Sequence, residues 1–321
     1  MGAFGIRGMC WRRNRMKQIY AGLLVSSILI GIWLLLQAQT EHNDTVFKLN
    51  QEIQTLRAKI HRIQTHEVDT SIPIIYVITP TYTRPVQKAE LTRLMNAFTL
   101  VPNLHWIIVE DSSSKTDLVK NLLTSFPKPS THLNIQTPAK MKLKPKDKWW
   151  SKPRGVFQRN LALSWLKENE KNKEGIIYFA DDDNTYSVDL FEEIRGTKRV
   201  SVLPVGLVGG VKVEKPQVSG GKVVGWEVGW GNERPFAVDM AGFAINLQYF
   251  LKHTDVKFLE QVKVGHQESE FLFQLVSLDQ LEPVAVGRVL VWHTRTQALN
   301  LNREDWFLKH YGYSSDTGIE L

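Results

Sequence analysis

The sequence predicts an α/β protein with a Rossmann-like half, in which strands of a parallel sheet alternate with helices. Three observations support this prediction. Apolar runs of strand length alternate with amphipathic helical stretches from residue 74 to residue 180. Several of these runs end in polar residues, which parallel strands would bring to one edge of the sheet. From residue 200 onward strand-like runs follow one another with fewer helical stretches between them, and we expect a second half that is continuous with the first.

The N-terminal residues are predicted to lie outside this fold. Residues 1–18 form a basic tail, whose five basic residues account for most of the formal net charge of +7. Residues 19–36 carry no charge and are long enough for a transmembrane helix. Because the basic flank precedes this segment, we expect a type II signal anchor with a cytoplasmic tail and a lumenal body. A cleaved signal peptide is the alternative.

Residues 37–71 are predicted to form a stem. Apolar residues recur there at alternating spacings of three and four, which is typical of a short coiled coil that pairs two chains. They are Val46, Leu49, Ile53, Leu56, Ile60 and Ile63. The alternative is one amphipathic helix packed on the body, since fewer than three heptads give a marginal coiled coil.

Charge and cysteine content exclude two classes of protein. Without the basic tail the net charge is only +2, whereas a nucleic-acid-binding protein needs its basic excess on the folded domain. Cys10, in the tail, is the only cysteine, so the body is not a disulfide-stabilised scaffold. Cys10 is either an idle thiol or a palmitoylation site, and Asn43 opens the only glycosylation sequon.

The body, residues 72–321, is taken in chain order. We expect strands over residues 74–79, 104–109, 132–137 and 176–180, alternating with helices over 88–100, 118–126 and 155–167. Strand-like runs then follow over 200–208, 211–213, 222–226, 239–245 and 289–293, with helical stretches near Gln248 and Gln267. The pair Gly220-Gly221 predicts a hairpin turn before residue 222. The right-handed crossovers of the first half would place its polar strand ends on one edge.

Three consecutive carboxylates, Asp181, Asp182 and Asp183, follow the strand over 176–180. Adjacent anions repel one another unless a cation shares the site, and oxygen ligands suit Mg²⁺ or Mn²⁺. Such ions usually take one or two protein carboxylates and complete their shell with water and substrate phosphates. This stretch therefore predicts a metal that holds a diphosphate. A solvated acidic turn that caps the next helix is the alternative.

Other residues complete this hypothesis. Asp111 and Tyr82, at neighbouring strand ends, are candidates to hold a base. Arg154 and Arg159 are candidates for phosphate or carboxylate contacts, because a guanidinium binds both in a bidentate way. The basic run from Lys140 to Arg154 predicts either a flap over an anionic ligand or a solvated loop.

Glu268 and two tryptophans are the candidates on the opposite side of the site. Glu268 opens a helical stretch, either as a general base or as an acid favoured by the helix dipole. Trp226 and Trp230 flank a glycine-rich turn, where an indole suits a sugar face, although one of them is expected in the core. These residues together indicate a metal-dependent nucleotide-sugar transferase.

Seven stretches resemble the β1,3-glucuronosyltransferase family, in the family's order and over residues 72–295. They are TPTYTRPVQKAELTR, LHWIIVED, RGVFQRNLAL, YFADDDNTYS, VDMAGFA, HQES and VLVWHTRT. The resemblance implies a GT-A fold and an inverting, Mn²⁺-dependent, homodimeric type II enzyme of the Golgi membrane. It implies transfer of glucuronate from UDP-glucuronate to the 3-hydroxyl of a galactose-terminated glycan on protein or lipid. The acceptor would be Galβ1-3Gal-Xyl of proteoglycans or N-acetyllactosamine.

The resemblance also implies a role for each matched residue. On the donor side these are Tyr82 and Asp111 for uracil, Arg154 and Asp182 for the nucleotide, Asp181 and Arg159 for the sugar, and His293 and Arg295 near the diphosphate and sugar. On the acceptor side they are Glu214, Trp230, Arg234 and Asp239. Asp183 would bind the metal, and Glu268 would be the general base.

Two alternatives remain beside this interpretation. One is a transferase of the same fold that uses another UDP-sugar. The other is a catalytically dead, membrane-tethered glycan-binding protein. The joint presence of Asp183 and Glu268 argues against the second, because a lectin needs neither.

Overall fold

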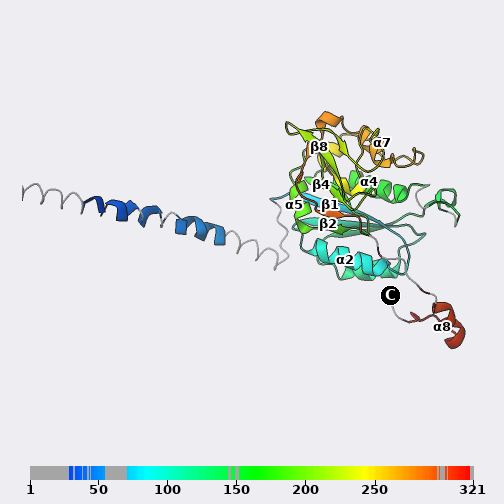
Figure 1. Cartoon of the computed structure of the whole chain (residues 1–321). Helices are drawn as coiled ribbons and strands as arrows, with labels where there is room; N and C mark the ends of the chain where they lie inside the picture. The colour runs from blue at the N-terminus through cyan, green and yellow to red at the C-terminus, as the bar shows by residue number, and fades with distance from the viewer. Residues whose placement is uncertain are drawn as a thin grey trace, which may run out of the picture. The chain divides into compact units, whose positions relative to one another are not determined.

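The computed structural model describes residues 29–31, 33–37, 39–41, 43, 45–54, 71–143, 146–148, 152–294, 296, 301 and 303–318. The chain divides into two compact units, Met1–Thr65 and His66–Leu321. All described residues of the first unit are helical (Figure 1). Of the predicted coiled-coil positions, Val46, Leu49 and Ile53 are exposed in the single chain, and the other three lie outside the described residues.

The predicted anchor, residues 19–36, lies largely outside the described residues, since positions 19–28 and 32 are not among them. Within the part of the chain that is described, no helix combines the length and the apolar character needed to span a membrane.

The second unit contains a seven-stranded sheet with the order β11-β6-β10-β4-β1-β2-β3. Its parallel part is made of β4 (Gly175–Phe179), β1 (Ile74–Thr81), β2 (Leu104–Glu110) and β3 (Ser130–Asn134). Ile78 lies opposite Phe179, and Thr81 lies opposite Glu110, so three strands end at the same edge. The predicted alternation of strands and helices is confirmed for this half.

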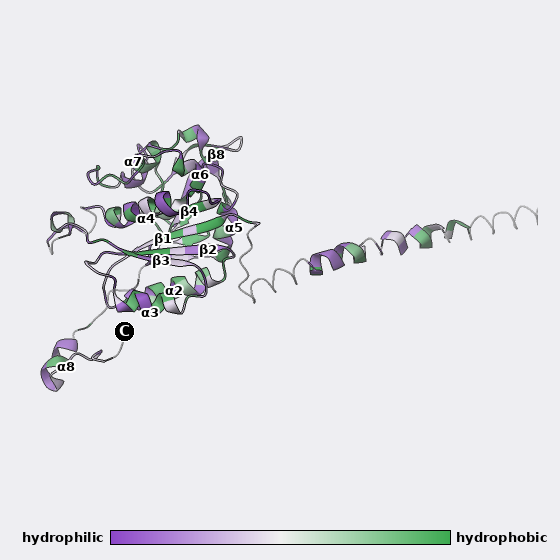
Figure 2. Ribbon diagram, turned by 180° about the vertical axis from the view of Figure 1, so that it is seen from behind, coloured by the Kyte–Doolittle hydropathy of each residue, from purple (hydrophilic) through white to green (hydrophobic). Residues whose placement is uncertain are grey.

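Helices cover both faces of this sheet because successive side chains of a strand point to opposite faces. Ile75 and Val77 of β1 belong to the core shared with α2 (Gln87–Thr99) and α3 (Asp117–Thr124). Tyr76 and Ile78 belong to the core shared with α4 (Val156–Asn169). Helices α2 and α4 accordingly lie on opposite sides of the sheet (Figure 1). Figure 2 shows the hydrophobic central strands between these helices.

The sheet is mixed, because strands of the second half join the parallel strands of the first. Strand β10 (Phe243–Asn246) runs antiparallel to β4 and to β6 (Val200–Val202), and it lies between them. Strand β11 (Glu282–Pro283) then pairs with β6 in parallel. An apolar run has the same local pattern in either direction, so periodicity alone cannot give the orientation of a strand.

A second, five-stranded sheet has the order β5-β12-β7-β8-β9. These strands are β5 (Thr185–Tyr186), β12 (Val291–Trp292), β7 (Val205–Gly206), β8 (Val213–Ser219) and β9 (Lys222–Glu227). The predicted hairpin joins β8 to β9, and its glycines have φ angles of 56° and 75°. Trp292 lies opposite Thr185, so the residues after β12 run beside the three aspartates.

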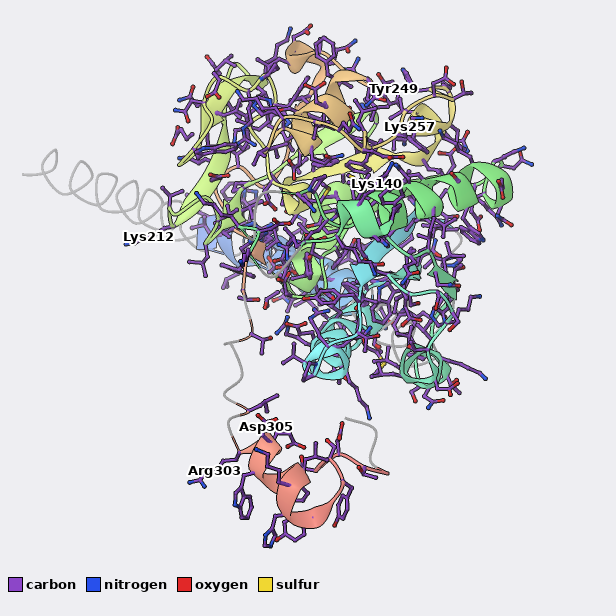
Figure 3. The ribbon with its side chains drawn as sticks, turned by 90° about the vertical axis from the view of Figure 1, so that its right-hand side faces the viewer. Lys140, Lys212, Tyr249, Lys257, Arg303 and Asp305 are labelled. Carbon is purple, nitrogen blue, oxygen red and sulfur yellow. The ribbon has the colours of Figure 1, made fainter. Side chains whose placement is uncertain are left out.

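The remaining elements are short. They are α5 (Val188–Ile194), α6 (Leu247–Leu251), α7 (Gln267–Phe273), α8 (Glu304–Tyr311) and the 3-10 turns η1 (Ala139–Met141), η2 (Met240–Gly242) and η3 (Leu278–Gln280). Figure 3 marks Arg303 and Asp305 at the start of α8.

Candidate active site

The ends of three neighbouring parallel strands gather most of the predicted donor-side residues. Tyr82 follows β1, Asp111 follows β2, and the three aspartates follow β4 after Ala180. The backbone N–H of Asp111 donates to Thr81 O at 2.8 Å, and the N–H of Ala180 donates to Ile78 O at 2.9 Å. The sheet therefore continues to the point where these side chains begin, as the sequence predicted.

The three aspartates have different partners. Asp181 pairs with Arg159 Nη2, and Asp182 Oδ1 lies 2.8 Å from Arg84 Nη2. Burial raises the pKa of Asp182 to about 6, because it outweighs the opposing effect of the Arg84 cation. Asp183 has no ion-pair partner among the described residues, and burial together with the charge of Asp181 raises the pKa of its carboxyl. A carboxylate in this situation favours a bound cation.

These side chains fit a divalent cation that is shared with a phosphate ligand. Across the described ranges, no group of three or more His, Cys, Asp or Glu side chains is placed as a cage for a metal. A cation held by Asp183 would therefore take most of its oxygen ligands from water and from a diphosphate, as is usual for Mg²⁺ and comparable hard cations.

Tyr82 and Asp111 follow neighbouring strands, as the hypothesis that they hold a base requires. Tyr82 is 50% exposed, so one part of its ring is free to stack. Arg84 covers another part, with its guanidinium carbon 4.4 Å from the ring centroid. Asp111 Oδ1 accepts a hydrogen bond from the Thr137 N–H at 2.7 Å, which fixes the orientation of the carboxylate.

Arg154 and Arg159 do not share a helix, because α4 begins at Val156. Arg154 is exposed, and its carbonyl accepts a hydrogen bond from Arg159 Nη1 at 2.9 Å. Gly155 separates them with a φ of 73°, and a Cβ there would lie 2.6 Å from Arg159 Nη1. The glycine therefore allows the guanidinium to fold back against the turn and reach Asp181.

Trp230 forms a rigid platform on the predicted acceptor side. Arg234 donates hydrogen bonds to the carbonyls of Trp230, Gly231 and Gly265 at 3.0, 3.1 and 2.9 Å. Its guanidinium carbon lies 4.6 Å from the Trp230 ring centroid. A Cβ on Gly265 would lie 2.1 Å from Trp230 Cη2, so the ring packs directly on this glycine. About half of the side chain's surface remains available to a ligand, since Trp230 is 49% exposed.

Trp226, by contrast, belongs to the edge of the core. Its Nε1 donates to Pro235 O at 3.0 Å, and its ring packs against the buried cluster that contains α4. Of the two tryptophans, the structure therefore leaves Trp230 for a ligand and assigns Trp226 to packing.

Glu214, Asp239 and His293 lie beside the platform. Glu214 Oε1 accepts from the Gly229 N–H at 3.0 Å, and burial raises the pKa of its carboxyl. Asp239 Oδ1 caps η2 by accepting from the Ala241 N–H at 2.9 Å, while Oδ2 lies 3.4 Å from His293 Nε2. His293 follows β12, the strand that pairs with β5, and thus links that strand to the predicted acceptor side.

Glu268 lies in the first turn of α7, near charged groups of the predicted donor side and of the predicted acceptor side. Burial raises the pKa of its carboxyl to about 7, and the Asp239 carboxylate raises it further. The Arg159 and Arg234 cations act in the opposite direction. A surface acid that only caps a helix would have its pKa lowered by the dipole, so the site favours the general-base interpretation.

Two predictions extend into residues that are not described. Arg295 lies outside the described residues, as do positions 144, 145 and 149–151 of the basic run. Within that run, Lys152 Nζ donates to Lys142 O at 2.6 Å and lies 3.3 Å from Asp147 Oδ2. Lys140, marked in Figure 3, is exposed. The flap over an anionic ligand stays a prediction.

Sequence reasoning missed Arg84 and Glu90. Arg84 pairs with Asp182 and with Glu90 Oε2, and Glu90 itself is 2% exposed. Both residues stand in the stretch that follows β1, but their pairing depends on how α2 packs, which no local pattern reveals.

The chain is similar to known glycosyltransferases. Residues 94–297 match the model of glycosyltransferase family 43. The galactosylgalactosylxylosylprotein 3-beta-glucuronosyltransferase I of Drosophila melanogaster is 51% identical, over 78% of this chain and 85% of its own length. The Homo sapiens galactosylgalactosylxylosylprotein 3-beta-glucuronosyltransferases 1 and 2 are 52% and 51% identical, over 71% and 73% of this chain and 70% and 72% of their own lengths.

Solved structures are similar at a lower level. Residues 1–349 of S. aureus TarS superpose with a TM-score of 0.45 and 15% identity, covering 76% of this chain and 73% of that one. The same protein in complex with UDP-GlcNAc gives a TM-score of 0.43 and 16% identity, covering 73% of this chain and 63% of that one. At these values the likeness carries no argument about the site.

Proposed function

The chain belongs to glycosyltransferase family 43, and from this membership we propose that it transfers glucuronate from UDP-glucuronate to the 3-hydroxyl of a terminal β-galactose. The fold is a mixed α/β glycosyltransferase fold, and its assignment to the GT-A type is part of the proposal. The acceptor that fits the names of the relatives is the Galβ1-3Gal-Xyl linkage region of proteoglycans.

The observation that carries the proposal is the position of Glu268. The pKa of its carboxyl is raised to about 7. Burial and Asp239 of the acceptor side raise this pKa, whereas Arg159 of the donor side and Arg234 of the acceptor side lower it. A base with this pKa is ionised in a large fraction of molecules near neutral pH, and it can take the proton of an attacking hydroxyl. One base and one in-line displacement invert the anomeric carbon, giving a β-linkage from an α-linked donor.

The remaining residues bind and orient the two substrates. Tyr82 and Asp111 hold the uracil, and Asp182 and Arg154 contact the rest of the nucleotide. Trp230 supports the apolar face of a galactose, and Glu214 and Asp239 accept hydrogen bonds from its hydroxyls. His293, and Arg295 beyond it, face the diphosphate and the glucuronate carboxylate. Mn²⁺, when bound by Asp183 and the diphosphate, supplies Lewis-acid stabilisation of the departing UDP.

The cellular setting forms part of the same proposal. The uncharged segment 19–36 after a basic tail supports a single-pass type II anchor in the Golgi membrane with the body in the lumen. The apolar positions Val46, Leu49 and Ile53, exposed in one chain, support pairing of two stems in a homodimer.

Competition between two acceptors tests the proposal. The whole chain is given UDP-glucuronate with Mn²⁺, and Galβ1-3Gal-Xyl and N-acetyllactosamine are supplied separately and then together. We expect faster release of UDP with the first acceptor. Preference for N-acetyllactosamine would replace the proteoglycan acceptor by a glycoprotein or glycolipid one, and release with neither would refute glucuronate transfer.

A further inference from the structure

Arg84 joins two parts of the predicted donor site that come from different strands. Its guanidinium carbon lies 4.4 Å from the ring centroid of Tyr82, and its Nη1 donates to the Tyr82 carbonyl at 3.1 Å. Its Nη2 lies 2.8 Å from Asp182 Oδ1. The side chain is only 13% exposed. Its guanidinium therefore fixes the position of Tyr82, after β1, relative to Asp182, after β4.

Helix α2 holds this arginine in place. Glu90, in the first turn of α2, pairs through Oε2 with the same Nη2 atom. Its other oxygen, Oε1, accepts a hydrogen bond from Thr296 Oγ1 at 2.6 Å, in the segment that follows β12. One turn further along α2, Arg93 Nη2 donates to the Asp182 carbonyl at 3.3 Å. The aspartate is therefore held at its carboxylate and at its backbone.

Asp182 keeps one oxygen for a ligand. The residue is only 7% exposed, and its buried Oδ2 has no hydrogen-bond partner among the described residues. A buried acceptor without a donor is costly, and a ligand hydroxyl or N–H directed at it removes that cost. Arg84 contacts Oδ1. Of the two carboxylate oxygens, Oδ2 is therefore the one left for a ligand.

From these contacts we infer that Arg84, kept in place by Glu90, is a positioning residue that sets Tyr82 and Asp182 for the nucleoside part of the donor. The inference rests on the proposed function and assigns to it two residues outside the predicted site. Arg84 itself touches neither the reacting atoms nor the acceptor platform. Its loss should therefore weaken donor binding while the acceptor side is unchanged.

Arg84→Lys is the informative change, because it keeps the charge beside Glu90 and Asp182. Lysine lacks the planar fork, so it cannot stack on Tyr82 and contact both carboxylates at once. Arg195→Lys is the matched control. Arg195 is also buried, and it donates to the carbonyls of Pro73 and Pro102, which belong to no predicted site.

The affinities of the whole chain for UMP and for UDP with Mn²⁺ are measured by calorimetry, together with the KM for UDP-glucuronate and for the acceptor. UMP lacks the β-phosphate and reports on the uridine together with its first phosphate. For Arg84→Lys we expect the Kd for both nucleotides and the donor KM to rise about tenfold, with the acceptor KM changed less than about twofold. Arg195→Lys should lower the Tm and leave both Kd values unchanged. Glu90→Gln should produce a smaller change in the same direction as Arg84→Lys.

Nucleotide Kd values in Arg84→Lys equal to those of the unsubstituted chain would overturn the inference. Donor and acceptor KM rising together, as a general loss of structure would cause, would overturn it as well. The proposed function is judged separately on the unsubstituted chain. If that chain binds no UDP or transfers no glucuronate, the function fails before the variants are compared.

Discussion

Glu268 combines a first-turn position on α7 with a carboxyl whose pKa is about 7. Glu270, two residues further along the same helix, is exposed. Both acids lie in the first turn and experience the helix dipole, but only Glu268 is enclosed by the site. A difference between variants of the two acids therefore reports on catalysis and not on the dipole.

Glu268→Gln should lower kcat about 10²- to 10⁴-fold, the usual contribution of a general base, while the Kd for UDP stays unchanged. Glu270→Gln, the matched control, should leave both quantities unchanged. Steady-state kinetics and calorimetry on the purified variants give the answer. A kcat close to that of the unsubstituted chain in Glu268→Gln would remove this residue as the base.

The pH dependence of kcat/KM should report the same group. Glu268 must be ionised to accept a proton, so kcat/KM should rise with pH below about 7 and level off above it. The stability effect has the opposite sign. Since the pKa is raised from 4.5, this group favours the folded state at low pH, and its contribution is lost as the pH rises to about 7. A flat kcat/KM profile between pH 5 and 8 would contradict the assignment.

At the scale of elements, the turn that opens α4 determines where Arg159 lies. Gly155 has a φ of 73°, and its missing side chain leaves room for the arginine that reaches Asp181. Gly221, in the hairpin between β8 and β9, has a similar φ of 75° with no atom near its missing Cβ. Both glycines therefore adopt a positive φ, but only Gly155 has a side chain, that of Arg159, where a Cβ would lie.

Gly155→Ala and Gly221→Ala should each lower the free energy of unfolding by about 1–2 kcal/mol, because an alanine is strained at positive φ. Only Gly155→Ala should also lower kcat/KM for UDP-glucuronate, by about tenfold, because its methyl group displaces Arg159. Chemical denaturation and donor kinetics measure the two effects. Equal kcat/KM in both variants would show that the position of Arg159 does not depend on the glycine.

Sequence patterns predicted the parallel strands, their helices and the edge where their polar residues meet, because burial on both faces leaves long apolar runs. They did not predict β5 or β11, because these two-residue strands stand in no apolar run. Nor did they give the direction of β10, which runs antiparallel to β4. Motifs located Asp183 and Glu268, but not Arg84, whose ion pairs depend on the packing of α2 against the sheet.

At the scale of the molecule, the unit from His66 to Leu321 has its own core and contains every described site residue. A chain that starts at Ile72 should therefore remain soluble and keep its kcat. Sedimentation then reports on the stem. A monomeric, active body would place dimerisation in residues 37–71, whereas an insoluble or inactive one would show that the N-terminal residues support the fold.

We propose that this site transfers glucuronate to a galactose. The most direct test is release of UDP from UDP-glucuronate by the whole chain in the presence of Mn²⁺, with and without Galβ1-3Gal-Xyl, and with Asp183→Asn measured alongside. We expect release that requires the galactoside, a β-linked product and a strongly reduced dependence on Mn²⁺ in the variant. Absence of galactoside-dependent release, in a chain that still binds UDP, would contradict it.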